Sequence, residues 1–162
     1  MSDRIGIGYD IHCLKKGRKL FLGGMQIPHS QGLSGHSDAD ALLHALCDAF
    51  LGAIGAGDIG KFFPDTDPRY KGISSIILLK KVYSLVKQRG FKVNNIDSII
   101  ITQAPRLENY KEEIAKNISR LLKIRPKIIN VKAKTNAGLG PIGKGQAIAA
   151  YAAVSLKTEK KK

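Results

Sequence analysis

The chain has 162 residues, of which 43% are hydrophobic and 25% charged, and its formal net charge is +14. This size and composition predict one globular domain with a substantial core, and no apolar run is long enough for a membrane-spanning helix. The two cysteines are too few and too far apart for a disulfide scaffold or a Cys-x-x-Cys site, which favours a cytoplasmic location.

The first predicted strand places two candidate ligands on one face. It follows the N-terminus directly, so we expect no signal peptide. Asp10 and His12 are two residues apart, and their side chains therefore leave the strand on the same side. Gly6 and Gly8 keep that side bare, which lets another backbone or a ligand approach closely. The other face is apolar and would be exposed in a monomer, which predicts an oligomer. That apolar face consists of Ile5, Ile7, Tyr9 and Ile11.

A short β-hairpin is predicted next. Residues 20–22 and 25–27 flank Gly23-Gly24, which is a two-residue turn signal. A loop through residues 32–35 then leads to the start of a helix at His36. Free N–H groups at a helix start favour an anion, so His36 is a candidate for anion binding. Its alternative role is that of an ordinary polar residue at a helix start.

The helix that follows carries the third candidate ligand. Ser37 is the expected N-cap, with Asp40 at the N3 position in a weak capping box. His44 then shares one stripe of the helix with Asp40 and Asp48, at i, i+4, i+8 spacing. The remaining positions are mostly apolar, and Cys47 among them is expected to be buried filler.

One carboxylate and two imidazoles, from Asp10, His12 and His44, form a candidate metal site. Three protein ligands are typical of a catalytic zinc, which keeps its fourth position open, whereas a structural zinc has four. Asp40 or Asp48 could orient the ring of His44. Each residue alone has a plainer explanation, because a single helix histidine is usually just a satisfied polar residue and Asp-x-His is often a surface pair.

The second half of the chain alternates helices and strands. Gly, Pro and Asp are dense at residues 57–72, which predicts a shaped loop without the ligands of a calcium loop. In the glycine-rich segment 134–145, exposed N–H groups could cradle a phosphate, with Lys144 adding charge. Pro105 is expected in the first turn of the helix that contains Ile114. The other predicted elements are a helix at 74–89 and strands at 93–102, 127–134 and 145–156.

These elements predict an α+β fold with a ferredoxin-like single sheet, backed by helices on one face, plus a short β-hairpin. The catalytic domain is expected to span residues 1–156, with a basic tail at 157–162. The net charge attracts anions, but no basic cluster is interleaved with aromatic residues as a stacking platform requires. The charge is therefore interpreted as favouring solubility and an anionic substrate, and nucleic acid is an unlikely partner.

Four motifs occur in a fixed order along the chain. They are Asp-x-His at 10–12, His-Ser-Asp-x-Asp at 36–40, Gly-Asp-Ile-Gly-Lys-Phe-Phe-Pro-Asp-Thr-Asp-Pro at 57–68 and Gln-Ala-Pro at 103–105. In this order the chain resembles the 2-C-methyl-D-erythritol 2,4-cyclodiphosphate synthase family, from about Arg4 to about Leu156. The series is far more specific than any one of its motifs.

The resemblance implies a phosphorus–oxygen lyase of non-mevalonate isoprenoid biosynthesis. In the implied reaction, the 2-phosphate of 4-diphosphocytidyl-2-C-methyl-D-erythritol 2-phosphate attacks its own β-phosphate and CMP leaves. Asp10, His12 and His44 would hold one Zn2+ per subunit, and Mg2+ or Mn2+ would bridge substrate phosphates. His36 and Thr135 would act in catalysis. The family also implies a homotrimer with sheets facing the threefold axis and active sites between subunits. No membrane partner is expected, because no apolar run is long enough to cross a bilayer.

The resemblance further implies a set of substrate-binding residues, which would contact the methylerythritol, the phosphates and the cytosine. They are Asp10, His12, His36, Ser37, Asp58, Ile59, Gly60, Phe63, Pro64, Asp65, Thr66, Asp67, Thr102, Gln103, Ala104, Pro105, Arg106, Leu107, Glu108, Lys134, Thr135, Asn136, Ala137, Pro141 and Lys144.

The glycine-rich segment departs from the family pattern. The family has a Glu that holds the second metal where this chain has Ala137, an aromatic residue of the central cavity where it has Pro141, and an Arg where it has Lys144. The second metal site and any ligand of the central cavity are thereby in doubt.

Two other functions remain open on the sequence. A zinc-dependent phosphohydrolase would use the same three ligands and a metal-bound water, releasing inorganic phosphate. A basic nucleic-acid-binding module rests on the net charge alone, and its binding would weaken steeply with salt.

Overall fold

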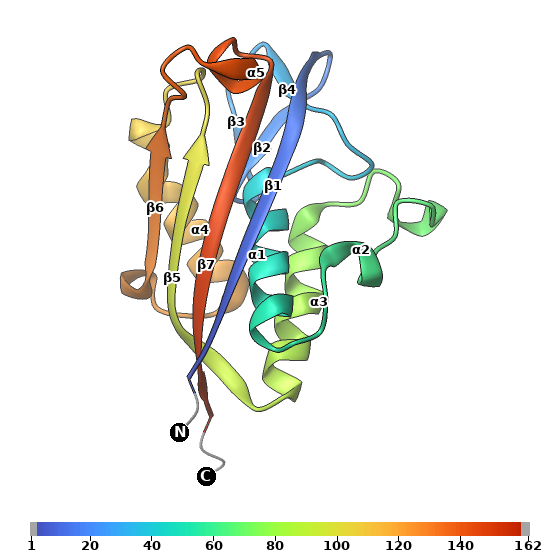
Figure 1. Ribbon diagram of the computed structural model, residues 1–162, viewed down its shortest axis with the longest axis vertical. Coiled ribbons are helices and arrows are strands. Elements are labelled where there is room, and N and C mark those ends of the chain that lie inside the picture. Colours follow the sequence, from blue (N-terminus) through green and yellow to red (C-terminus); the bar gives the residue numbers. More distant parts are fainter. Residues whose placement is uncertain (1–2, 160–162) are drawn as a thin grey trace.

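Five strands form one mixed sheet in the order β4-β1-β7-β5-β6 (Figure 1). The computed structural model describes residues 3–159 of the chain. A separate hairpin pairs β2 with β3, as the Gly23-Gly24 turn predicts. The strands are β1 (Arg4–Lys16), β2 (Leu20–Leu22), β3 (Met25–Ile27), β4 (Gln31–Leu33), β5 (Phe91–Ile101), β6 (Ile129–Lys134) and β7 (Ala147–Thr158).

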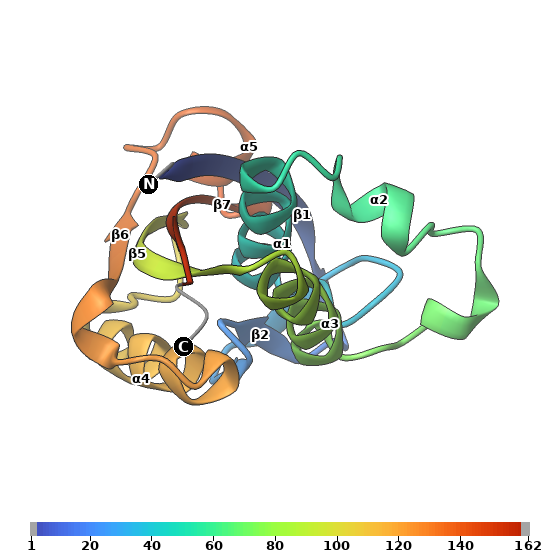
Figure 2. The same ribbon diagram turned by 90° about the horizontal axis from the view of Figure 1, so that it is seen from below.

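Three long helices cover one face of this sheet. Figure 2 shows α1, α3 and α4 on the same side, and α1 packs mainly against β1 and β7. The predicted mixed α+β fold, with a sheet backed by helices, is therefore confirmed. The helices are α1 (Ala41–Ala53), α2 (Ile59–Phe62), α3 (Ser75–Gln88), α4 (Lys111–Leu122) and α5 (Gly140–Gly143), with 3-10 turns at Pro68–Tyr70, Glu108–Tyr110 and Pro126–Ile128.

The order of elements differs from the ferredoxin-like prediction. A ferredoxin-like chain runs β-α-β-β-α-β, whereas the main elements here run β1, α1 with α3, β5, α4, β6 and β7. The crossover through α4 makes β5 and β6 parallel, and β7 inserts antiparallel between β1 and β5. The ferredoxin-like topology is thus wrong, and the strand predicted at 93–102 lies inside the sheet, between β7 and β6.

The strand β1 packs very closely against the helix α1. A Cβ atom added to Gly6 would lie 1.9 Å from the carbonyl oxygen of Ala49, and one added to Gly8 would lie 2.0 Å from that of Ala45. Only glycine allows the strand to lie this near the helix backbone. The predicted bare face of the strand is confirmed, and it faces a helix.

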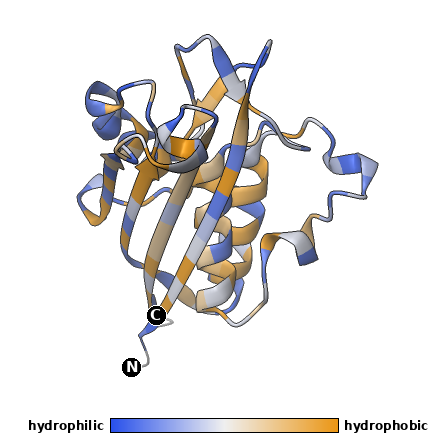
Figure 3. Cartoon of the chain, turned by 45° about the horizontal axis from the view of Figure 1, so that its top comes forward, coloured by the Kyte–Doolittle hydropathy of each residue, from blue (hydrophilic) through white to orange (hydrophobic). Residues whose placement is uncertain are grey.

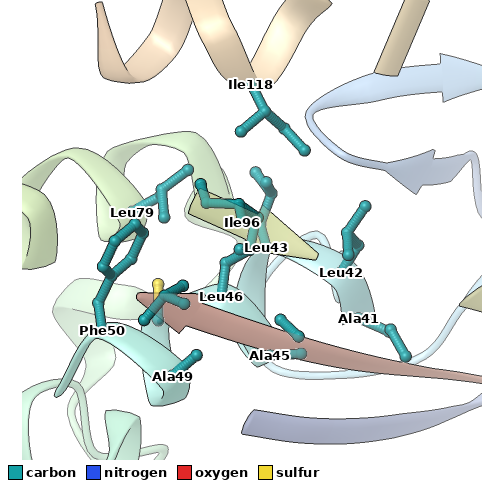
Figure 4. Close-up of a cluster of buried hydrophobic side chains, with 14 of the residues drawn as sticks. Ala41, Leu42, Leu43, Ala45, Leu46, Ala49, Phe50, Leu79, Ile96 and Ile118 are labelled. Atoms are coloured by element: carbon teal, nitrogen blue, oxygen red, sulfur yellow. The ribbon is translucent and has the colours of Figure 1, made fainter. Parts of the chain in front are cut away.

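The hydrophobic core lies between the sheet and the helices (Figure 4). Leu43, Leu46 and Phe50 of α1 are fully buried and extend toward Leu79 of α3 and Ile118 of α4. Cys47 is also fully buried, as predicted. The side of α1 that faces β1 is made of small residues, which agrees with the close approach there.

The other face of the sheet is uncovered in the single chain. Ile5 and Ile7 are 75% and 78% exposed, and Tyr9, Ile11 and Tyr151 are also exposed. Hydrophobic residues recur along the strands in Figure 3. The predicted exposure of this face in a monomer is confirmed.

The helix α1 begins later than predicted. Its N-cap is Asp40, whose carboxylate accepts a hydrogen bond from the N–H of Leu43. Ser37 is not the N-cap, because the chain turns at Ala39 with a φ of +56° before the helix starts. Asp40 is also fully buried, and its oxygens accept hydrogen bonds from the N–H groups of Gly23 and Gly24 in the hairpin turn.

Several other boundaries differ. The first strand continues beyond His12 to Lys16 because its end pairs with the unpredicted strand β4. Pro105 precedes α4 by several residues, since buried Leu107 and a 3-10 turn intervene. The short helix α5 within the glycine-rich segment was not predicted. The strand β7 includes Lys157 and Thr158 of the predicted tail, and residues 160–162 lie outside the described part of the chain.

Within residues 3–159, no helix combines the length and the apolar character that crossing a bilayer requires.

The contact between β1 and α1 predicts a large cost for Gly8→Ala. The added methyl group would overlap the Ala45 carbonyl, and overpacking of this kind costs about 1–3 kcal/mol or more. The control is Gly52→Ala in α1, where the nearest atom to the new Cβ would be 3.9 Å away. That change should be neutral or stabilise by up to about 1 kcal/mol. Urea unfolding measures both, and equal stabilities would contradict the packing argument.

Candidate metal centre and cleft

Three side chains converge at the edge of the contact between β1 and α1. Asp10 Oδ2 lies 2.8 Å from His12 Nε2 and 2.9 Å from His44 Nδ1, and the two ring nitrogens are 3.2 Å apart. The strand supplies Asp10 and His12 from one face, and the first turn of α1 supplies His44. Their side chains are only 13–23% exposed. The predicted triad is therefore assembled as a possible metal-binding group.

The far side of each imidazole is held by the surrounding chain. Nδ1 of His12 lies 3.0 Å from the carbonyl oxygen of Ser34. A carbonyl can only accept, so this nitrogen carries the proton and donates it. Nε2 of His44 lies 2.8 Å from the hydroxyl of Ser75 and 3.1 Å from that of Ser37. Contacts of this kind fix the orientation of metal-binding histidines.

The inner atoms of the triad are all electron donors. With its Nδ1 protonated, a neutral His12 directs the lone pair of Nε2 toward the Asp10 carboxylate. Nδ1 of His44 lies beside the same carboxylate oxygen. Lone pairs this close together repel one another unless a proton or a cation lies among them. A positive charge among these three atoms would therefore stabilise the triad strongly.

The pKa values of Asp10 and His44 reflect the same stabilisation by positive charge. Burial by itself would raise the pKa of Asp10, but its contacts with the imidazoles of His12 and His44 outweigh burial and lower it well below its ordinary value. Burial by itself would lower the pKa of His44, but its hydrogen bond to Asp10 outweighs burial and raises it. Both shifts favour a carboxylate beside a protonated imidazole.

A cleft of about 380 Å3 opens onto the triad. The predicted residues that line it together with the triad are His36, Ser37, Ile59, Gly60, Phe63 and Asp65. Besides Asp48, four lining residues were not among the predicted site residues: Gly35, Tyr70, Ile73 and Leu78. Tyr70 could have been suspected from the dense loop at 57–72, whereas Leu78 looks like any core residue of an amphipathic helix.

The remaining predicted residues of the loop lie beside the cleft and do not line it. Asp58 is the N-cap of α2 and accepts the N–H of Lys61. Asp67 forms a forked ion pair with Arg69, and its carbonyl oxygen lies 3.4 Å from Nε2 of His36. The other two are Pro64 and Thr66, and both are exposed.

The carboxylates expected to orient His44 bind backbone N–H groups instead. Asp40 is bound to the hairpin turn and to Leu43, as described above. Asp48 lines the cleft, but its Oδ1 accepts the N–H of Ile59 at 2.7 Å and so holds the start of α2. The ring of His44 is instead contacted by serines, of which Ser75 escaped prediction. Only its place beside the expected helix start at residue 74 hinted at a special role.

A second group of predicted residues lies at the ends of β5 and β6, beside α5 and away from α2 (Figure 1). Thr102 and Lys134 are joined there by a backbone hydrogen bond of 2.9 Å. None of this group lines the cleft of the same chain. Its members are Thr102, Gln103, Ala104, Pro105, Arg106, Leu107, Glu108, Lys134, Thr135, Asn136, Ala137, Pro141 and Lys144.

Known proteins match almost the whole chain. A protein from Halothermothrix orenii named 2-C-methyl-D-erythritol 2,4-cyclodiphosphate synthase is 56% identical over 153 residues, covering 94% of this chain and 93% of its own length. One of the same name from Clostridium acetobutylicum is 55% identical over 145 residues, covering 90% and 94%.

Solved structures agree with these matches. A structure of "IspF (Plasmodium falciparum) CDP complex" has a TM-score of 0.86 at 36% identity and covers 98% of both chains. The bifunctional IspDF of Campylobacter jejuni has a TM-score of 0.93 at 42% identity, covering 97% of this chain and 42% of its own. The model of the YgbB family matches residues 3–157. On its sequence and its fold, the chain belongs to the YgbB family.

Proposed function

We propose that this chain is a 2-C-methyl-D-erythritol 2,4-cyclodiphosphate synthase. It would convert 4-diphosphocytidyl-2-C-methyl-D-erythritol 2-phosphate into the cyclic diphosphate and CMP, in non-mevalonate isoprenoid biosynthesis in the cytoplasm. The observation that carries the proposal is the convergence of Asp10, His12 and His44 in the lining of a cleft, in a chain with 56% identity to a synthase of that name.

The donor set of the triad fits Zn2+. Two imidazole nitrogens and one carboxylate oxygen leave a fourth position open, which is the arrangement of catalytic zinc sites. Asp10, His12 and His44 would hold the ion, which would supply Lewis-acid polarisation of a substrate phosphate oxygen. A second ion, Mg2+ or Mn2+, would lie between substrate phosphates. Ala137 has no carboxylate to bind that ion, so phosphate oxygens and water would hold it.

The proposed chemistry needs no protein nucleophile. The attacking 2-phosphate and the β-phosphate belong to one molecule, so the chain acts by holding them together and by balancing charge. His36 lines the cleft, where its ring could contact phosphate oxygens whose charge grows during transfer. Ile59, Gly60, Phe63 and Asp65 would enclose the methylerythritol part.

The site would be completed by a second copy of the chain. The group at the ends of β5 and β6, which includes Thr135 and Arg106, lies outside the cleft of its own protomer. In a homotrimer with the uncovered sheet faces around the threefold axis, this group would meet a neighbour's cleft and bind the nucleotide. Solved CDP complexes of related synthases support a nucleotide subsite, and the apolar exposure of β1 supports the assembly.

The central test is a product assay with the cytidyl substrate. Wild-type protein with Zn2+ and Mg2+ should form CMP and a cyclic diphosphate in equal amounts, measured by 31P NMR. His44→Ala should lower the rate by more than about 100-fold, because it removes a direct metal ligand. His29→Ala, outside the site, should leave it unchanged.

Two results of this assay would contradict the proposal. Release of inorganic phosphate without a cyclic product would instead indicate a zinc-dependent phosphohydrolase. Full cyclisation by His44→Ala would remove that residue from the metal site.

The metal-free protein should have an unusual dependence of stability on pH. The raised pKa of His44 adds stability that is complete below about 6.5, the ordinary histidine value, and is lost as pH rises through the folded-state pKa. The lowered pKa of Asp10 adds stability that is complete above about 4 and is lost as pH falls toward the folded-state pKa. Both contributions are complete between these values.

Calorimetry of chelator-treated protein tests this prediction. The melting temperature should fall as pH rises from 6 to 9, relative to His44→Ala treated in the same way. Added Zn2+ should reverse the trend, since the ion takes the place of the proton on His44 and bound metal stabilises the folded state. Parallel curves for wild type and His44→Ala would contradict the prediction.

The proposed trimer is tested by Ile7→Lys. Ile7 is 78% exposed in the single chain and lies on the uncovered sheet face, so a charge there should prevent burial against a neighbour. Sedimentation should show trimers for the wild type and smaller species for Ile7→Lys. Ile77→Lys is the control, since Ile77 is 45% exposed on α3 and away from that face. Identical sedimentation of wild type and Ile7→Lys would contradict the assembly.

A further inference from the structure

A fully buried serine at the start of α3 touches the ring of His44. Its hydroxyl, Ser75 Oγ, lies 2.8 Å from Nε2 of His44 and also hydrogen-bonds to Oδ1 of Asp38. The backbone N–H of Ser75 donates to Oδ2 of the same carboxylate at 3.0 Å. Asp38 thus holds Ser75 by both its hydroxyl and its backbone.

The chemistry of the three groups sets the direction of the hydrogen bonds. An ionised carboxylate can only accept, so the Ser75 hydroxyl must donate its single proton to Asp38. The oxygen of Ser75 then has only lone pairs to offer His44. The proton of the neutral imidazole is therefore on Nε2, and the lone pair of Nδ1 is directed at Asp10 and the metal position.

We propose that Ser75, backed by Asp38, is a positioning residue that holds His44 in the tautomer and the orientation required for metal binding. This inference rests on the proposed metal site and concerns residues outside the predicted triad. Ser75 does not itself contact the metal position. It acts through the ring of His44, so its loss should weaken metal binding while the three ligands remain.

The pair also connects distant parts of the chain. Asp38 belongs to the segment that leads into α1, and its N–H donates to the carbonyl of Ile73 at 3.1 Å. The N–H of Gly72 donates to the carbonyl of His36 at 2.8 Å. The start of α3 is thereby fixed against the start of α1, directly after the loop that contributes to the cleft. The position of His44 depends on this junction.

Ser37 is the alternative partner of His44, at 3.1 Å from Nε2. Its hydroxyl oxygen already accepts the N–H of Ala39 at 3.0 Å. Unlike Ser75, it makes no contact with a carboxylate that would dictate the direction of its proton. Ser75 is therefore the partner that determines the tautomer.

The test measures Zn2+ affinity, by competition with a chromophoric chelator, and does not depend on activity. Ser75→Ala should weaken binding by about 10–100-fold, as loss of a group that orients a metal ligand commonly does. The matched control is Ser74→Ala, because Ser74 caps α3 through the N–H of Ile76 and does not touch His44. That variant should bind Zn2+ like the wild type, even if its melting temperature falls.

A double mutant tests whether Asp38 acts through Ser75. Asp38→Asn should weaken Zn2+ binding in the wild-type background and have little further effect in Ser75→Ala, because the two residues act in series. Additive losses would show that Asp38 acts by another route and would overturn the pair. Circular dichroism checks that each variant is folded.

The wild-type protein provides an independent test that no folding defect can disturb. In zinc-loaded protein, 15N NMR of the histidine rings should show His44 protonated on Nε2 and metal-bound through Nδ1. The opposite assignment, or equal Zn2+ affinity in Ser75→Ala and wild type, would overturn the inference. If the wild type binds no Zn2+ at all, the proposed metal site itself has failed, which is a distinguishable result.

Discussion

The site depends on how closely β1 approaches α1. Gly6 and Gly8 bring the strand against the helix backbone, and Asp10 and His12 continue the same face of the strand just beyond the contact. His44 projects from the first turn of the helix at the same level. The distance between ligands from two elements is therefore set by a contact between backbones, which is stiffer than one mediated by long side chains.

The triad was predicted from a local pattern together with the resemblance to a family. Alternation placed Asp10 and His12 on one side of a strand, and the order of motifs paired them with His44. Most strands and long helices were also predicted, because their periodicity is strong. The ferredoxin-like topology was wrong because the succession of elements along a chain does not state which strands pair. The insertion of β7 between β1 and β5 depends on the pairing of all the strands in the sheet.

The groups around the triad were predicted less well, and the reason is physical. Spacing on a helix suggested that Asp40 and Asp48 would orient His44, but each carboxylate satisfies backbone N–H groups of another segment. Ser75 comes to His44 from 31 positions away in the chain. Tertiary packing determines such partners, and the periodicity of hydrophobic residues in the sequence carries no information about it. In the proposed trimer, the group at the ends of β5 and β6 would pose the same difficulty between chains.

The β2–β3 hairpin stands apart from the main sheet, and its attachment has a consequence for how this fold can vary. Asp40 binds both glycines of its turn, and Asn117 of α4 donates to the carbonyl of Gly23 at 2.8 Å. One buried carboxylate thus connects the hairpin turn to the start of α1. A shortened hairpin would leave the buried carboxylate of Asp40 without these hydrogen-bond donors. Insertions and deletions should therefore be rare in this hairpin as the family diverges, although it lies outside the main sheet.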